Sequence, residues 1–506
     1  MAISSTLRSG ADFIRSETLI QNQTQLADLN RQLATGERAT TYGDLGSSRV
    51  QSISLRSDIS RLEAFQDSIQ RVDIRVDITV LSLERLESIR SEGRDAVTPN
   101  NFVDLGNGNT FGQQLTEVLL TETVALLNSQ ADNRYIFGGN DVSSPPVEDL
   151  DLILNGDATR AGLRDVTDER LQADLGANGL GRLDIAIDPA APNVVTLNEE
   201  VATDFGFDLA GIDSDLSGVN AVFTSGEPAS LEVDFVAQPG FGETIRVFVD
   251  LPDGTQEIIA LTADGDANDS SSFAVGSTSA VTAENFQNAL RDEISELART
   301  DLSAVSRLVS ADNFFNTEAG RQPQRVDLSG GGTPETATGL VDGTETDTVL
   351  FYTGQNDADD PRIGLTARVD ETINVNYGLR ANEEGLRSNL ATLAAFSIAD
   401  FTSGNLEDNQ AAYAALASRA SNELAIQVDQ PSIQSVIQEV AGIQAVSGNA
   451  DARHTIAINA LDGIREDIER ADPTEVALQL LGLQTSIEAS FSASSRISQL
   501  SLLEFI

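Results

Sequence analysis

The 506-residue chain contains no cysteine and no tryptophan, and His454 is its only histidine. Without cysteine the chain can form no disulfide, no thiolate metal site and no cysteine nucleophile. We find no nucleophile motif near His454 that would make it part of a catalytic triad. The composition therefore predicts no enzymatic activity, no catalytic residues, no cofactor and no metal site.

Long apolar runs are also missing. No stretch approaches the ~18 apolar residues of a membrane-spanning helix, and residues 1–30 lack the short apolar core of a cleaved signal peptide. These absences predict that the chain does not insert into membranes. Taken alone they are typical of a cytoplasmic protein, but they leave open an export route that reads an uncleaved N-terminus.

Positive charge is scarce. All 32 basic residues are arginine, whereas 79 residues are acidic, so the formal net charge is −47. Such a chain repels nucleic acid and anionic lipid, which excludes nucleic acid as an expected partner. The acidity itself is typical of a solvated surface from a saline habitat or of a GC-rich genome.

What the chain does contain is helical periodicity at both ends. Apolar residues follow an a/d heptad over about five repeats between residues 48 and 92, which predicts a coiled-coil seam and a helix ~65 Å long. The residues of this seam are Leu55, Leu62, Phe65, Ile69, Val72, Val76, Leu83 and Leu86. A matching heptad near the C-terminus comprises Val440, Ile443, Leu461, Ile464 and Ile468. His454 falls on this second seam, where a polar residue can set the register of packing.

Outer stripes extend beyond both seams. Asp472-Pro473-Thr474-Glu475 predicts the start of a last helix, because Asp can cap, Pro suits the first turn and Glu can close a capping box. That helix runs to an apolar end, SQLSLLEFI, where soluble chains usually become polar. The predicted assembly residues are Leu19, Leu26, Leu29, Leu33, Leu480, Leu483, Ile487, Phe491, Ile497, Leu500 and Leu503.

Between the helical arms, residues 141–365 read as short strands, turns and acidic loops. Residues 244–251 and 255–262 flank Pro252-Asp253-Gly254, which predicts a β-hairpin. An amphipathic helix is predicted for residues 285–299, and a strand for VLFYTG at 349–354. Two acidic stretches, NDADD (356–360) and DGDANDS (264–270), superficially resemble calcium loops but lack the spacing of an EF-hand.

The expected fold is mainly α with a β-rich insert. Because one helix cannot bury its own stripe, the two arms should pair as an antiparallel long-helix coiled-coil bundle that carries one or two α+β outer domains. The predicted divisions are an N-terminal assembly helix and turn (1–45), an N-terminal long-helix arm (46–140), the β-rich or α+β insert (141–365), a C-terminal helical arm (366–471) and a C-terminal assembly helix (472–506).

Several stretches resemble the bacterial flagellar axial proteins, the flagellin and hook-associated family. LNRQLATGERATTYGDLG (29–46) and SLRSDISRLEAF (54–65) are similar to the N-terminal pattern of the hook-associated protein three group. VNYGLRANEEGLRSNLATLAAF (375–396) looks like the re-entry into the C-terminal arm, and the segment from 472 to the end resembles the closing helix. The family's Tyr-Leu-Phe-Gly-Gly motif is matched, with isoleucine for leucine, by Tyr135, Ile136, Phe137, Gly138 and Gly139.

The resemblance implies a structural subunit of the hook–filament junction, outside the cell. It implies that the terminal helices polymerise into a ring or hollow tube while the middle faces outward. The implied partners are other copies, another hook-associated protein, flagellin, and an export chaperone that shields the C-terminus. It also implies type III export without a cleaved signal.

Two features keep an alternative open within the family. ATGERATTYGDLGSSR (34–49) lacks the Ser-Gly-Leu-Arg-Ile-Asn stretch usual in flagellins, and the ending LSLLEFI is junction-like. The insert, however, is long for a junction protein, and large outer domains are common in flagellins. A filament flagellin is therefore the alternative, and a secreted adhesin acting through the insert is a remote one.

Overall fold

The computed structural model describes the backbone of residues 3–266, 271–426 and 430–503, and the side chains of residues 17–266, 271–426 and 430–496. Its contacts divide the chain into two compact units. We call Met1–Arg71, Arg368–Asn374 and Val446–Ile506 the terminal unit. Val72–Ala367 and Val375–Ala445 form the central unit.

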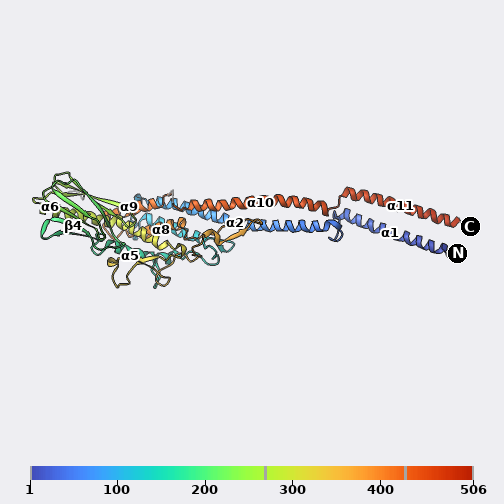
Figure 1. Ribbon diagram of the computed structural model, residues 1–506, viewed down its shortest axis with the longest axis horizontal. Helices are drawn as coiled ribbons and strands as arrows, with labels where there is room; N and C mark the ends of the chain where they lie inside the picture. The colour runs from blue at the N-terminus through green and yellow to red at the C-terminus, as the bar shows by residue number, and fades with distance from the viewer. Residues whose placement is uncertain (1–2, 267–270, 427–429, 504–506) are drawn as a thin grey trace. The chain divides into compact units, whose positions relative to one another are not determined.

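The terminal unit is built from paired antiparallel helices. Helices α1 (Ile3–Thr35) and α11 (Pro473–Leu503) pack side by side, with the two ends of the chain at the same end of the pair (Figure 1). The first half of α2 (Arg49–Ala96) lies along the second half of α10 (Ile433–Glu469). Gln66 links the two helices, since its Nε2 donates to Asp451 Oδ1 and Thr455 Oγ1 at 2.9 Å. The predicted antiparallel pairing of the N- and C-terminal arms is confirmed.

The turn between α1 and α2 and the turn between α10 and α11 form hydrogen bonds with each other. The turn after α1 begins at Gly36, whose φ of +72° is a conformation that glycine adopts without steric cost. Arg38 N donates to Glu469 O at 2.8 Å, and Ala471 N donates to Gly36 O at 2.9 Å. These backbone bonds tie the α1–α2 turn to the α10–α11 turn.

The helices of the central unit bury an aromatic cluster. Helix α3 (Phe111–Leu127) packs on α8 (Glu384–Ile398), and α7 (Ser303–Phe315) contacts both α8 and α9 (Leu406–Glu423). Tyr413 is fully buried among Phe102, Phe396 and Phe401, with ring centroids 5.0–5.3 Å apart. The predicted mainly helical frame is confirmed here as well.

The β-rich insert forms two four-stranded sheets covered by helix α6 (Ser279–Leu297). The Thr278 side chain caps α6 by accepting from Val281 N at 3.3 Å. Phe286, Leu290 and Ile294 on its inner face are fully buried against the sheets. The first sheet has the order β3 (Leu183–Asp188), β4 (Ala191–Glu199), β7 (Ser230–Phe235), β6 (Val219–Thr224). The second has the order β10 (Ser272–Ala274), β9 (Gln256–Asp264), β8 (Thr244–Asp250), β5 (Asp208–Ser214).

Strands β8 and β9 form the predicted antiparallel hairpin, with Asp250 opposite Gln256 across the Pro252-Asp253-Gly254 turn. Smaller elements complete the frame. They are α4 (Leu150–Asn155), α5 (Leu163–Leu175), and three two-stranded pairs: β1 (Gln130–Ala131) with β2 (Arg134–Tyr135), β11 (Gln324–Val326) with β12 (Leu340–Asp342), and β13 (Thr366–Arg368) with β14 (Asn374–Asn376).

The predicted strand at 349–354 is wrong. Val349 and Phe351 are fully buried, as the apolar pattern suggested, but the segment forms only one isolated bridge, between Tyr352 and Val147. Its backbone bonds to irregular chain instead, with Val349 N donating to Ala161 O at 3.0 Å and Thr353 N donating to Pro146 O at 2.9 Å. These two backbone groups are hydrogen-bonded without a regular sheet.

Candidate assembly site and junction of the two arms

The predicted assembly residues lie on the α1–α11 pair in differing environments. Leu29 is 4% exposed, and Leu19, Leu26, Leu480, Leu483 and Ile487 are half-buried. Leu33 and Phe491 are exposed, at 48% and 56%. The side chains of Ile497, Leu500 and Leu503 lie outside the described residues. The structure thus brings part of the set together within one chain and leaves part of it at the surface.

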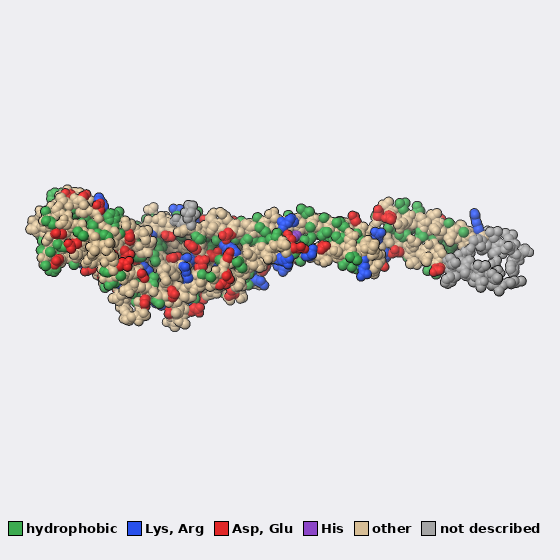
Figure 2. Space-filling model, in the orientation of Figure 1, with side chains coloured by type: hydrophobic (Ala, Val, Ile, Leu, Met, Phe, Trp, Pro, Cys, Tyr) green, Lys and Arg blue, Asp and Glu red, His purple; other side chains and the backbone are tan. Residues whose placement is uncertain are grey.

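A second apolar stripe on α11 was missed by the sequence analysis. Leu478 and Leu481 are 65% and 62% exposed, and Ile20 on α1 is 63% exposed. The signal was present in the sequence, because α11 is apolar on more than one face and a helix of that kind is normally buried. Figure 2 shows hydrophobic side chains at the surface of the coloured part of the helix pair.

The α2–α10 seam is closed by apolar side chains in each unit. In the terminal unit Leu55 and Ile69 are buried, Leu62, Phe65, Leu461 and Ile468 are half-buried, and Ile464 is 45% exposed. In the central unit Val72, Val76, Leu83, Leu86 and Val440 are buried and Ile443 is half-buried. Such a mixture of buried and half-buried side chains is expected of a seam between two helices, since each helix covers only one side of the other.

An ion pair marks the end of the seam in the terminal unit. Arg56 donates two hydrogen bonds to the Glu469 carboxylate, at 2.9 and 2.5 Å, and Ser52 Oγ donates a third at 2.6 Å. The hydrogen bond from Arg56 holds the pKa of Glu469 below its usual range, since it stabilises the ionised form. The pair fixes which turn of α2 faces the end of α10.

His454 lies buried in the terminal unit, 3% exposed. Its Nε2 is 2.8 Å from Val369 O, and its ring stacks on Phe65 with centroids 5.5 Å apart. Arg453 and Asp370 form an adjacent ion pair at 3.0 Å. His454 therefore joins α10 to residues 368–374, a role in packing rather than in chemistry.

The Tyr-Ile-Phe-Gly-Gly motif meets the re-entry segment of the C-terminal arm inside the central unit. Ile136 and Phe137 are buried, at 2% and 0% exposed. Ala381 N donates to Phe137 O at 2.9 Å, and Gly139 N donates to Leu379 O at 2.8 Å. Two segments 240 residues apart in the chain thus pair through their backbones, and each arm closes on the other at this junction.

Both glycines of the motif are required at that contact. A Cβ on Gly138 would lie 2.2 Å from Asp141 O, which is backbone and cannot turn aside, and Gly139 has a φ of +65°. The motif ends in two glycines because one position leaves no space for a side chain and the other needs a left-handed backbone.

Arg380 binds the acidic stretch NDADD (356–360), whose sequence superficially resembles a calcium loop. Its Nη2 donates to Asp357 Oδ1 at 2.6 Å and its Nη1 donates to Asp357 O at 2.7 Å. Hydrogen bonds from Gln355 and Arg380 lower the pKa of Asp357. Among the described residues, no group of three or more His, Asp or Glu side chains is arranged to hold a metal ion.

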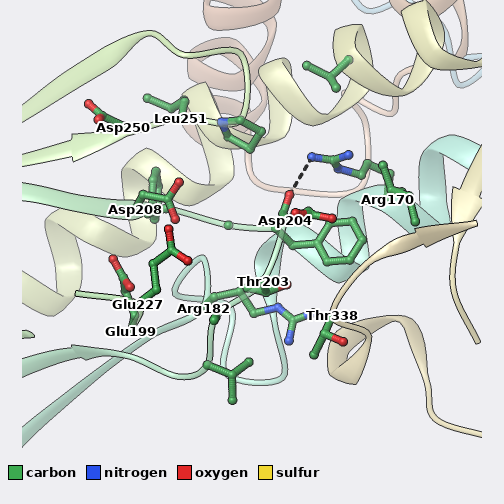
Figure 3. A pocket seen from close by; sticks show the side chains of 18 of the residues that line it. Arg170, Arg182, Glu199, Thr203, Asp204, Asp208, Glu227, Asp250, Leu251 and Thr338 are labelled. Carbon is green, nitrogen blue, oxygen red and sulfur yellow. Dashed lines mark hydrogen bonds between the residues drawn. The ribbon is translucent and has the colours of Figure 1, made fainter. Parts of the chain in front are cut away.

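A cavity of about 950 Å³ opens within the β-rich insert, between the ends of its strands and helices α5 and α7. Glu199, Asp208 and Glu227 lie at one end of it, and Arg170 and Arg182 lie at the other (Figure 3). The two guanidinium groups lie over the ring of Phe205, at 4.8 and 5.8 Å from its centroid. Glu199 accepts from Leu209 N and Ala229 N, at 2.7 and 2.6 Å, so its carboxylate joins two strand ends.

Asp208 gives this cavity a pH dependence. Burial, followed by the charges of Glu199 and Asp250, raises the pKa of Asp208 to about 6. Because the folded-state pKa exceeds the unfolded value, ionised Asp208 destabilises the fold above pH 6, and the penalty disappears as the pH falls toward 4. Solvent screening at this partly exposed carboxyl limits the effect to about 1 kcal/mol.

We therefore expect Asp208→Asn to stabilise the insert by about 1 kcal/mol at pH 7.5 and to leave its stability unchanged at pH 4. Urea unfolding at the two pH values, followed by circular dichroism, measures this. Glu232→Gln, an exposed carboxylate on β7, is the matched control and should show no such difference. Equal stabilisation by both variants would contradict the assignment.

Within the part of the chain that the structure describes, no helix has the length and apolar character needed to cross a membrane. Residues 9–103 match the family model of the bacterial flagellin N-terminal helical region. No curated protein sequence matches the chain significantly. The matched segment includes all of α2 and most of α1. This part of the chain is therefore similar to the N-terminal helical region of bacterial flagellins.

Proposed function

We propose, on the premise of a flagellin-type N-terminal region, that this protein is the subunit that joins hook to filament in a bacterial flagellum. Its copies would associate through the α1–α11 pairs into a ring or short tube. The insert would face outward, and the chain would act as a building block rather than as an enzyme. The junction assignment, the partners and the export route go beyond the family match and are part of the proposal.

The exposed apolar surface of the α1–α11 pair carries the proposal. Monomeric proteins seldom leave apolar patches of this kind uncovered. Helix α1 has three Arg against three acidic residues, and α11 has only Glu475, Glu488 and Arg496. These two helices therefore contribute about one of the 47 net negative charges, and they are where two equally acidic copies can approach.

The insert has the opposite property. Residues 141–365 contain 11 Arg against 42 Asp and Glu, which gives a net charge of −31. Inserts of neighbouring copies repel each other, and this repulsion favours an arrangement with the inserts spread outward and the terminal helices gathered together. The distribution of charge and the distribution of exposed apolar residues agree on the same orientation.

The proposed partners follow from the same surface. They are neighbouring subunits, another hook-associated protein and flagellin. Each would present apolar helices of the same type, which would bind the α1–α11 surface end to end. Before assembly the exposed stripe is an aggregation hazard, which favours a chaperone that binds the C-terminal helix during export. The junction is preferred to the filament because of the ending LSLLEFI and the departures within residues 34–49.

Immunogold labelling of intact flagella, combined with deletion of the gene, tests the position. The junction role predicts a single band at the tip of the hook, with the deletion strain keeping its hooks and releasing unpolymerised flagellin. Label along the whole filament would support the alternative, a filament flagellin, which the length of the insert favours. Normal filaments in the deletion strain would exclude the junction role.

A further inference from the structure

The cavity of about 950 Å³ within the insert lies where strands of both sheets end. Glu199 is the last residue of β4 and Asp208 is the first of β5, while Glu227 lies in the turn between β6 and β7. Helices α5 and α7 also line the cavity, through residues that include Arg170 and Asn313. A cavity of this volume is typical of sites that bind small molecules, and the proposed assembly through the terminal helices makes no use of it.

Two guanidinium groups at one end of the cavity are nearly excluded from water but keep unused donors. The exposed fraction is 5% for Arg170 and 3% for Arg182. Arg170 donates through Nε to Asp174 Oδ2 at 2.8 Å and through Nη2 to Asp204 O at 3.2 Å. Arg182 donates through Nε and Nη2 to backbone carbonyls, among them Ala337 O at 2.7 Å. Within the described residues, Nη1 of both arginines is left without a hydrogen bond, so each can donate to an anionic group in the cavity.

Arg182 also lacks a compensating anion. It forms no ion pair with any residue that the structure describes, and its burial lowers the pKa of its guanidinium group. Thr203 lines the same cavity, and its Oγ1 is buried without a hydrogen-bond partner among the described residues (Figure 3). A buried hydroxyl without a partner destabilises the fold. A ligand carboxylate could accept hydrogen bonds from both kinds of donor.

The other end of the cavity carries carboxylates without an opposite charge (Figure 3). In the described part of the chain, Asp208 and Glu227 have neither an ion pair nor a side-chain hydrogen bond. Asp208 also lies directly opposite Asp250 in the ladder of β5 and β8, where like charges repel. Five carboxylates and two guanidinium groups line the cavity, which leaves an excess of three negative charges. This end therefore attracts a cationic group.

The cationic group is expected to be organic. No three described His, Asp or Glu side chains are arranged to hold a metal ion, so the carboxylates are too dispersed to coordinate one. An ammonium or guanidinium group needs only one or two acceptors, which Asp208 and Glu227 can supply.

We propose that this cavity binds a small dipolar ligand, whose carboxylate contacts Arg170 and Arg182 and whose cationic end contacts Asp208 and Glu227. A basic amino acid is the simplest molecule with this chemistry, because an aliphatic chain separates its carboxylate from a second, cationic group. The ligand would supply the missing opposite charge at both ends of the cavity. The insert alone provides the residues of this site, so binding does not depend on assembly of the terminal helices.

Isothermal titration calorimetry of the full chain with L-arginine tests the proposal. We expect saturable binding of one L-arginine per chain. Agmatine keeps the guanidinium group but lacks the carboxylate, so it should bind about tenfold more weakly. Norvaline keeps the carboxylate but lacks the guanidinium group, and its affinity should fall by a similar factor.

Variants at the two ends should separate the contributions. Asp208→Asn should weaken the binding of both L-arginine and agmatine, because it removes a charge from the acidic end. Thr203→Val should weaken the binding of L-arginine but leave that of agmatine unchanged, because agmatine has no carboxylate to accept from Thr203. Glu232→Gln, at an exposed position of β7 that does not line the cavity, is the matched control and should bind L-arginine normally.

Absence of saturable binding of L-arginine at millimolar concentration would overturn the proposal. Equal affinities for L-arginine and agmatine would also overturn it, since the arginines would then contribute nothing. The acidic end can be tested even if Thr203→Val fails to fold, because Asp208→Asn is expected to stabilise the insert. Unchanged L-arginine binding by Asp208→Asn, or an equal loss in Glu232→Gln, would exclude the assigned site.

Discussion

Replacing Leu480 and Leu483 together by aspartate should abolish assembly and leave the insert folded. Both side chains are half-buried on the face of α11 that packs on α1. Burial of a leucine contributes ~1.5–3 kcal/mol, and placing a carboxylate in the same position adds a desolvation cost. The change therefore removes the pairing of the terminal helices, on which we propose assembly depends.

Two measurements check this. Motility of cells that carry the double variant should fall to that of a deletion strain, and the purified protein should stay monomeric in sedimentation. Thermal unfolding of the central unit should be unchanged, because α11 belongs to the terminal unit. Gln484→Asp, at an exposed position of the same helix, is the matched control and should assemble.

Normal motility in the double variant would contradict the role assigned to these helices. We expect the same phenotype from Leu500→Asp with Leu503→Asp, whose side chains lie outside the described residues. Removal of residues 472–506 should also weaken binding to an export chaperone, and undiminished capture in a pull-down would argue against a chaperone site there.

Phe137→Ala should lower the free energy of unfolding of the central unit by ~3–5 kcal/mol, the usual cost of truncating a buried phenylalanine. Phe137 is fully buried, and its carbonyl accepts from Ala381 N where the two arms meet. Truncation of the ring therefore leaves a cavity at the contact between the two arms, whose residues are distant in the chain. Urea unfolding of the full chain, followed by circular dichroism, measures the loss.

Gly138→Ala tests the same junction by a different mechanism. The added methyl group would meet Asp141 O at 2.2 Å, so the backbone has to move. We expect destabilisation comparable to that of Phe137→Ala, although only one carbon is added. Arg134→Ala, at an exposed position just before the motif, should change stability by less than ~0.5 kcal/mol. A Gly138→Ala variant as stable as this control would contradict the close approach.

The long helices and the hairpin could be predicted because their signals are local. The heptads of α2 and α10 repeat over many turns, and a helix from about 48 to 92 was expected where α2 spans Arg49–Ala96. The Pro252-Asp253-Gly254 turn lies between two alternating runs, so the β8–β9 register follows from its own residues. Periodicity and turn chemistry need no knowledge of the rest of the chain.

The apolar run at 349–354 shows where local signals stop being sufficient. Its residues are as buried as those of a strand, but the neighbours that its backbone bonds to are irregular segments far away in the sequence. Burial can be predicted from apolar character, whereas the pairing partner of a short segment depends on the whole fold.

The sequence by itself determined the helical arms, their apolar seams, the hairpin and the uneven distribution of charge, since all of these are properties of residue order and composition. Only the tertiary structure decided that Arg380 binds the acidic loop at 356–360, that Phe137 meets Ala381, and that Arg419 of α9 binds Asp253 and Glu257 of the β8–β9 hairpin. Each of these contacts joins residues that lie 23 to 244 positions apart in the chain. No local pattern in a single sequence predicts which distant residues will come into contact.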